Sequence, residues 1–209
     1  MDDRLEDEGG GRWERARRAS GGRPWLVPFL VIVVVPILIG AVVVLILGRG
    51  VGFEAVRRRT VHKFPDIQWT TTAELARWRE DSGRTQPLLL DARTKVEYQV
   101  SHLRDAVLDD AARPSLRPLR GRATSDPIVV YGSAGYRGAR LANWLGGQGF
   151  TNVRNLAGGI FLWANEDRPL IRDGRPTAQV HPYDHRWGLL LISRARADAP
   201  DVVTPFAAP

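Results

Sequence analysis

The stretch Asp126-Pro-Ile-Val-Val-Tyr-Gly-Ser-Ala-Gly-Tyr-Arg137 decides the fold of this chain. Its first half, 126–131, has the short apolar run of a buried strand. A loop of small residues follows, and 136–147 has the pattern of a helix that ends in two glycines. A buried strand that leads through such a loop into a helix is typical of α/β proteins.

The same alternation continues on both sides of this stretch. We expect helices over 72–79, 94–101, 136–147 and 158–163, and strands over 87–91, 126–131 and 152–156. A threonine caps the first helix, and Thr94 and Glu97 have the spacing of a capping box at the second. Strands that alternate with helices predict an α/β fold, with a parallel sheet flanked by helices on both faces.

An apolar run of a different kind precedes this region. Leu26 to Leu47 contains 22 residues without a charge, about 33 Å as a helix, and a bilayer core is about 30 Å thick. Pro28 and Pro36 are tolerated in membrane helices, and Trp25 stands where an interfacial aromatic belongs. A cleaved signal peptide is disfavoured, because its apolar core has about 7–15 residues. We predict one transmembrane helix over 25–48.

The remaining segments are assigned by composition. We expect a disordered polar tail over 1–24, a basic linker over 49–66, the α/β domain over 67–171 and a C-terminal extension over 172–209. The linker's three consecutive arginines suit either anionic headgroups or solvent. Within the extension, Trp187–Ile192 suits packing on the domain or on the membrane. Five basic residues flank each end of the predicted span, so the positive-inside rule does not decide its orientation.

Composition excludes several kinds of chemistry. The 209 residues include no cysteine, which excludes a disulfide framework, a thiolate zinc site, an Fe–S cluster and a cysteine nucleophile. The net charge of +7 comes almost entirely from scattered arginine, since Lys63 and Lys95 are the only lysines. Scattered cations do not make a nucleic-acid-binding surface, so no nucleic-acid partner is expected. We expect no cofactor.

Two segments stand where α/β proteins bind ligands, at the carboxyl ends of strands. One is Leu90–Arg93, and the other is the loop at 131–137. Backbone N–H groups of such a loop and the following helix N-terminus can together form an anion cradle, to which Arg137 adds a cation. A tight connection without any ligand is the alternative, because a glycine-containing loop alone is a weak signal.

Residues 88–171 closely resemble a rhodanese-like (sulfurtransferase) domain. The stretches LLLDARTKVEYQVSHL (88–103) and VVYGSAGYRGARLANWLGGQGFTNVRNLAGGIFLW (129–163) carry the resemblance. The family's D-x-R-x-x-x-E-Y-x-x-x-H pattern falls on Asp91, Arg93, Glu97, Tyr98 and His102. Its second half falls on Gly135, Arg137, Gly149, Phe150, Val153, Leu156, Gly158, Gly159 and Trp163.

The resemblance also implies what is missing. In this family a cysteine opens the loop and carries sulfane sulfur as a persulfide, but Gly132 stands at that position. Gly138 replaces a frequent serine, and Arg104-Asp105 replaces a common Pro-Gly. We therefore expect a membrane-anchored, catalytically inactive module that binds a small anion or a protein partner. The binding loop comprises Gly132, Ser133, Ala134, Gly135, Tyr136 and Arg137, with Asp91, Arg93 and His102 in support.

Two alternatives stay open at this point. The protein is an enzyme if a partner supplies the missing cysteine, or if Ser133 acts as the nucleophile of a hydrolase. His181, Asp184 and His185 suit either a metal site or a packing role, and we expect no metal there. By analogy with anchored rhodanese-like domains, we expect a bacterial inner-membrane protein whose soluble domain faces the cytoplasm.

Overall fold

The computed structural model describes residues 26–199. The tail expected over 1–24 lies outside these residues, as does the end of the C-terminal extension. The chain divides into two compact units between Leu47 and Gly48, and the α/β domain belongs to the second.

The apolar run is helical, but it is not one regular helix. It consists of α2 (Leu26–Phe29), a π-helical turn η1 (Leu30–Val34) and the start of α3 (Val35–Lys63). The π turn ends at Val34, two residues before Pro36, which has no N–H to donate to a carbonyl of the preceding turn.

The predicted transmembrane helix over 25–48 is not confirmed. Within residues 26–199, no helix combines the length and the apolar character needed to cross a bilayer. Helix α3 continues past the apolar run through Arg49 to Lys63, so charged side chains belong to the same helix. The segment expected as a linker is therefore largely helical, and Glu54 accepts hydrogen bonds there from Arg57 (2.8 Å) and Arg58 (3.0 Å).

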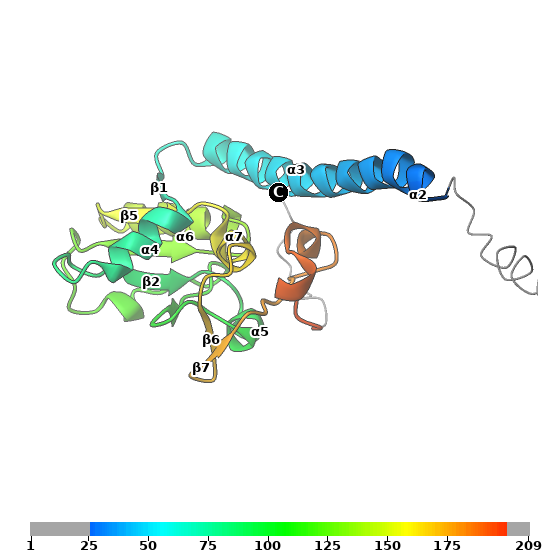
Figure 1. Ribbon diagram of the computed structural model, residues 1–209. Helices are drawn as coiled ribbons and strands as arrows, with labels where there is room; N and C mark the ends of the chain where they lie inside the picture. The colour runs from blue at the N-terminus through cyan, green and yellow to red at the C-terminus, as the bar shows by residue number, and fades with distance from the viewer. Residues whose placement is uncertain (1–25, 200–209) are drawn as a thin grey trace, which may run out of the picture. The chain divides into compact units, whose positions relative to one another are not determined.

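The domain is built on a five-stranded parallel sheet (Figure 1). Its strands are β1 (Gln68–Thr70), β2 (Leu88–Asp91), β3 (Val107–Leu108), β4 (Ile128–Tyr131) and β5 (Val153–Leu156). They lie in the order β1-β5-β4-β2-β3. Strands β2 and β4 pair over their full length, from Leu88 opposite Ile128 to Asp91 opposite Tyr131. The carboxyl ends of these two strands therefore lie side by side.

Helices cover both faces of this sheet, as the sequence predicts. They are α4 (Thr72–Glu80), α5 (Lys95–Val100), α6 (Tyr136–Gly147) and α7 (Gly159–Asn165). Successive strand residues point to opposite faces. Accordingly, Leu89 and Val129 pack in one apolar cluster with α4 and α7, whereas Leu90 and Val130 pack in a second cluster with α6.

Both expected threonine caps are present. Thr94 and Glu97 form the predicted capping box at α5, and a second box joins Thr71 and Glu74 at α4. Four short strands were not predicted: β1, β3, and the two strands of the hairpin, β6 (Leu170–Arg172) and β7 (Arg175–Thr177).

The described part of the C-terminal extension packs on the domain. It contains the 3-10 turns η3 (Trp187–Leu190) and η4 (Ser193–Ala195). Val180, Leu191 and Ala195 are buried in the cluster that also contains α4 and α7. Of the two surfaces expected for 187–192, the domain is the one that these side chains contact, although Leu189 is exposed.

Helix α6 approaches β5 closely at Gly138. A Cβ atom there would overlap the side-chain oxygen of Asn155, which is fully buried, and would lie 3.1 Å from the backbone N of Gly132. At Gly146, on the same helix, a Cβ atom meets nothing within 4 Å. An added methyl group would therefore clash with its neighbours at Gly138, whereas at Gly146 it has room.

We predict opposite effects of Gly138→Ala and Gly146→Ala on the free energy of unfolding. Gly138→Ala should destabilise by about 2 kcal/mol or more, because backbone and a buried amide cannot give way. Gly146→Ala should stabilise by up to about 1 kcal/mol, since alanine is the better helix former. Urea denaturation of both variants measures this. Equal effects of the two substitutions would contradict the close packing described for Gly138.

Candidate functional site

The loop at 132–135 connects the end of β4 to α6, and other elements hold its backbone. The carbonyls of Gly132 and Ser133 accept hydrogen bonds from the N–H groups of Ile160 (2.9 Å) and Phe161 (3.0 Å) in α7. The Asn155 side chain donates to the carbonyl of Gly135 (2.8 Å). Gly135 has φ +112°, a left-handed conformation that glycine adopts without strain. The loop is therefore rigidly placed without any ligand.

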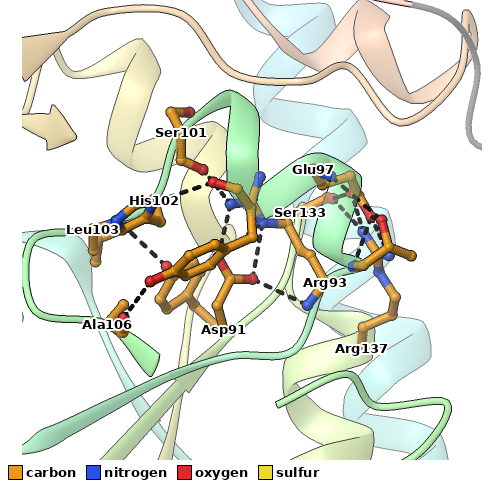
Figure 2. A network of polar contacts seen from close by, with 12 residues as sticks. Asp91, Arg93, Glu97, Ser101, His102, Leu103, Ala106, Ser133 and Arg137 are labelled. Carbon is orange, nitrogen blue, oxygen red and sulfur yellow. Dashed lines mark hydrogen bonds and ion pairs between the residues drawn. The ribbon is translucent and has the colours of Figure 1, made fainter. Parts of the chain in front are cut away.

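Arg137, the expected anion-binding cation, is bound by a carboxylate of the protein itself. Its Nη1 lies 2.7 Å from Glu97 Oε2 and its Nη2 2.5 Å from Glu97 Oε1. Ser133 Oγ accepts from Arg137 Nη2 (2.6 Å) and donates to Glu97 Oε1 (3.1 Å). Figure 2 shows Glu97, Ser133 and Arg137 gathered at one side of the polar network. The carboxylate of Glu97 thus binds Arg137 in the place where an external anion was expected.

Glu97 is fully buried and stays ionised. Burial favours the neutral acid, but the attraction of Arg137 outweighs it, and the pKa of Glu97 falls to about 2. The same carboxylate accepts hydrogen bonds from the backbone N (3.1 Å) and the hydroxyl (2.8 Å) of Thr94. One carboxylate therefore completes the capping box of α5 and also neutralises the charge of Arg137.

Asp91 and Arg93, which we expected to support the loop, form an ion pair at the end of β2. Arg93 Nη2 lies 2.7 Å from Asp91 Oδ2, both side chains are fully buried, and Arg93 also donates to the carbonyl of Ser101 (2.6 Å). Burial opposes the charge of Arg93, but the neighbouring Asp91 carboxylate still raises its pKa. The pair joins β2 to the end of α5, so its hydrogen bonds support the helix that carries Glu97 rather than the loop directly.

His102 lies on the other side of this network (Figure 2). Its ring stacks on Tyr98, with centroids 3.9 Å apart, and its Nδ1 lies 3.1 Å from the Tyr98 carbonyl. Its backbone N and O pair with Ile171. These contacts give His102 a packing role.

Neither a Ser133–His102 catalytic pair nor a metal site is assembled among residues 26–199. Ser133 Oγ bonds Glu97 and Arg137, and no bond to His102 is present in this part of the chain. No group of three or more His, Asp or Glu side chains within the described residues could hold a metal ion. Asp184 instead accepts a hydrogen bond from the backbone N of Trp187 (2.8 Å), and His181 accepts one from Tyr183 (3.0 Å).

A comparison with protein families agrees with this arrangement. The family model described as a rhodanese-like domain matches residues 71–166. Residues 71–166 form a rhodanese-like domain. The match includes the Asp91–Arg93 pair, Glu97 and the whole 132–137 loop.

Curated relatives are enzymes of greater length. A tRNA uridine(34) hydroxylase of Staphylococcus epidermidis is 34% identical over 106 residues, which are 47% of this chain and 32% of that protein. A tRNA uridine(34) hydroxylase of Shouchella clausii is 30% identical over 114 residues, 52% of this chain and 35% of that protein. The chain therefore spans about a third of the length of these relatives. A solved rhodanese-like domain from Anabaena sp. is 21% identical, with a TM-score of 0.46, over 68% of this chain and 95% of that one.

Sequence reasoning missed three residues around the loop. Glu97 was assigned to the capping box and to the family's pattern but not to the loop, although its place shortly after β2 was a usable signal. Asn155 is a polar residue inside a buried strand, which also marks it for a backbone contact. Tyr183 lies 46 residues from Arg137, yet the guanidinium carbon of Arg137 is 4.8 Å from the centre of its ring. No local pattern indicates that contact.

We predict that Glu97→Gln removes a pH-dependent part of the stability. The pKa of Glu97 is lower in the folded chain than its ordinary value of 4.5, so the stabilisation is complete above about pH 5 and is lost as the pH falls toward 2. The variant should be about 3 kcal/mol less stable at about pH 7. This difference should shrink by roughly 1–2 kcal/mol near pH 3, as measured by urea denaturation.

Glu80→Gln is the matched control, because Glu80 is an exposed carboxylate on α4. It should change stability by less than about 0.5 kcal/mol at either pH. A Glu97→Gln difference that does not vary with pH would show that the charge of Glu97 is not what stabilises the loop.

Proposed function

We propose that the rhodanese-like domain has no sulfurtransferase activity of its own and works as a binding module. One observation carries this proposal: Gly132 stands where the resemblance places the sulfur-carrying cysteine, and the chain has no cysteine at all. Sulfane transfer through this loop needs a thiolate, and the neutral hydroxyl of Ser133 is a far weaker nucleophile. Hydrogen bonds from α7 and from Asn155 nevertheless fix the backbone of the loop, which is the condition for a preformed binding site.

Between a small anion and a protein partner, we favour the protein partner. A free anion that bound Arg137 would have to displace Glu97 and leave a buried carboxylate without its counter-charge. Breaking a buried pair in this way costs roughly 3–5 kcal/mol. A protein partner avoids that cost, because it can contact the exposed surroundings of the loop while Glu97 stays in place.

We predict that the full chain shows no thiosulfate:cyanide sulfurtransferase activity. The reason is chemical, since no group in the chain can hold a persulfide. The assay measures thiocyanate, with heat-treated protein as the control. Thiocyanate formation clearly above that control would overturn the proposal.

Gly132→Cys tests whether the loop still suits a persulfide. A Cβ atom at 132 would lie 3.1 Å from the backbone N of Gly138 and 3.2 Å from Arg137 Cβ, a tight fit next to the N-terminus of α6. There the introduced thiolate would attack the outer sulfur of thiosulfate, form an S–S bond and release sulfite. We expect slow uptake of one sulfur atom, seen by mass spectrometry, and Ser82→Cys on the surface as the control should take up none. Absence of uptake would mean that the anion cradle is lost, which would further favour a protein partner over a small anion.

The names of the relatives favour a second candidate, a role in tRNA uridine hydroxylation. Two thirds of those proteins have no counterpart in the match, so this chain would contribute a domain to such an activity rather than the whole of it. Binding to tRNA discriminates the candidates, because phosphate contacts give an affinity that falls steeply with salt. We expect no salt-dependent retention of tRNA in a mobility-shift assay, and its appearance would favour the second candidate.

Attachment to a bilayer through residues 25–48, with the domain in the cytoplasm, stays a prediction from the sequence. The uncharged run of 22 residues is its support.

A further inference from the structure

The loop at 132–137 is buried beneath other parts of the same chain. Of its residues, only Tyr136 keeps intermediate exposure; the others are buried. From α3, Lys63 Nζ donates to the Tyr136 hydroxyl (2.7 Å), and the ring of Phe64, just beyond α3, lies 5.8 Å from the Tyr136 ring. Ligands of such folds enter at this end of the sheet, so in this structure their route is closed.

The C-terminal extension supplies the other part of the cover. We call residues 180–192 the cap segment; it is drawn in orange in Figure 1. The ring of Tyr183 lies over the guanidinium of Arg137, 4.8 Å from ring centre to carbon. Val180 and Leu191 are fully buried in the cluster that also holds Ala134 of the loop. The cap segment therefore contacts the loop at its one cation and shares its apolar packing.

The side chain of one domain residue hydrogen-bonds the cap segment at two points. Asn165, the last residue of α7, donates from Nδ2 to the carbonyl of Leu190 (2.7 Å) and accepts at Oδ1 from the backbone N of Ile192 (2.9 Å). The ion pair between Arg194 and Asp167, close by, is exposed and contributes little in water. Two hydrogen bonds of one amide thus add to the apolar packing of Val180 and Leu191 in attaching the segment.

The cap segment also carries local strain where it contacts the loop. Tyr183 has φ +69°, a left-handed conformation that a bulky residue rarely adopts. Strained backbone persists where surrounding contacts hold it, and such residues gather at sites that switch between states. Release of the segment would relieve this strain, which offsets part of the cost of exposing Val180 and Leu191.

We infer that the cap segment is an autoinhibitory cover of the loop, and that the loop becomes accessible when the segment leaves Asn165. The open state exposes Ser133, Arg137 and the N-terminus of α6 while the parallel sheet stays folded. The inference concerns access alone, so it holds whether the loop binds a partner, an anion or a substrate.

The absence of native cysteine makes a thiol at the loop a specific reporter of opening. Ser133→Cys places one buried thiol next to Arg137, whose guanidinium the ring of Tyr183 covers, and Ser82→Cys places one at an exposed position as the reference. N-ethylmaleimide, which is neutral, should label Ser133→Cys about a hundredfold more slowly than Ser82→Cys. Added to Ser133→Cys, Asn165→Ala should speed labelling about tenfold, because it removes both hydrogen bonds of the attachment.

Two further variants separate release of the cap segment from general loosening. Tyr183→Ala removes the ring over Arg137, leaves Asn165 intact, and should also speed labelling. Asn143→Ala, the same substitution at an exposed position of α6, should leave the rate within about twofold. Opening of the segment exposes less surface than unfolding of the whole domain, so the labelling rate should depend less steeply on urea than global unfolding does.

Three results would overturn the inference. The first is labelling of Ser133→Cys as fast as that of Ser82→Cys. The second is a rate that neither Asn165→Ala nor Tyr183→Ala increases. The third is a urea dependence equal to that of global unfolding, which would mean that the thiol is reached only when the whole domain unfolds.

Discussion

The buried ion pair between Glu97 and Arg137 is the constraint on which the rest of the site depends. Two charges removed from water are stable only when each satisfies the other. Glu97 belongs to α5, where it closes the capping box with Thr94, whereas Arg137 lies in the first turn of α6. The ion pair therefore requires three parts to form together: the start of α5, the loop after β4 and the start of α6.

This constraint explains how the loop keeps its shape without a nucleophile. Its carbonyls are bonded by α7 and by Asn155, and its cation is neutralised from within the protein. None of these interactions involves a side chain at position 132, so a glycine there leaves them untouched. The geometry of a rhodanese-like domain and its sulfur chemistry are thus separable in physical terms.

Much of the fold could be predicted from the sequence, because the central strands are continuous apolar runs and their helices carry cap and stop signals. Strands β1 and β3, with three and two residues, are too short to show a period. The helical state of 49–63 was missed because its charge suggests a flank, although Phe53 and Val56 pack against the core. Glu97 pairs with Arg137, which is 40 residues away in the chain, so a local pattern does not show its role. The contact of Tyr183 with Arg137 depends on how the C-terminal extension packs, which a local pattern does not show either.

The base of the cap segment is closed by backbone pairing. Val180 donates to the carbonyl of Ala195 (2.8 Å) and accepts from the N–H of Ala197 (2.9 Å), so the chain enters and leaves the segment at one point. A load attached after residue 197, such as a fused domain or a purification tag, would pull on this base and not on the tip at Tyr183. A proteolytic cut between Tyr183 and Leu190, in contrast, would free both halves of the tip while the base stays paired.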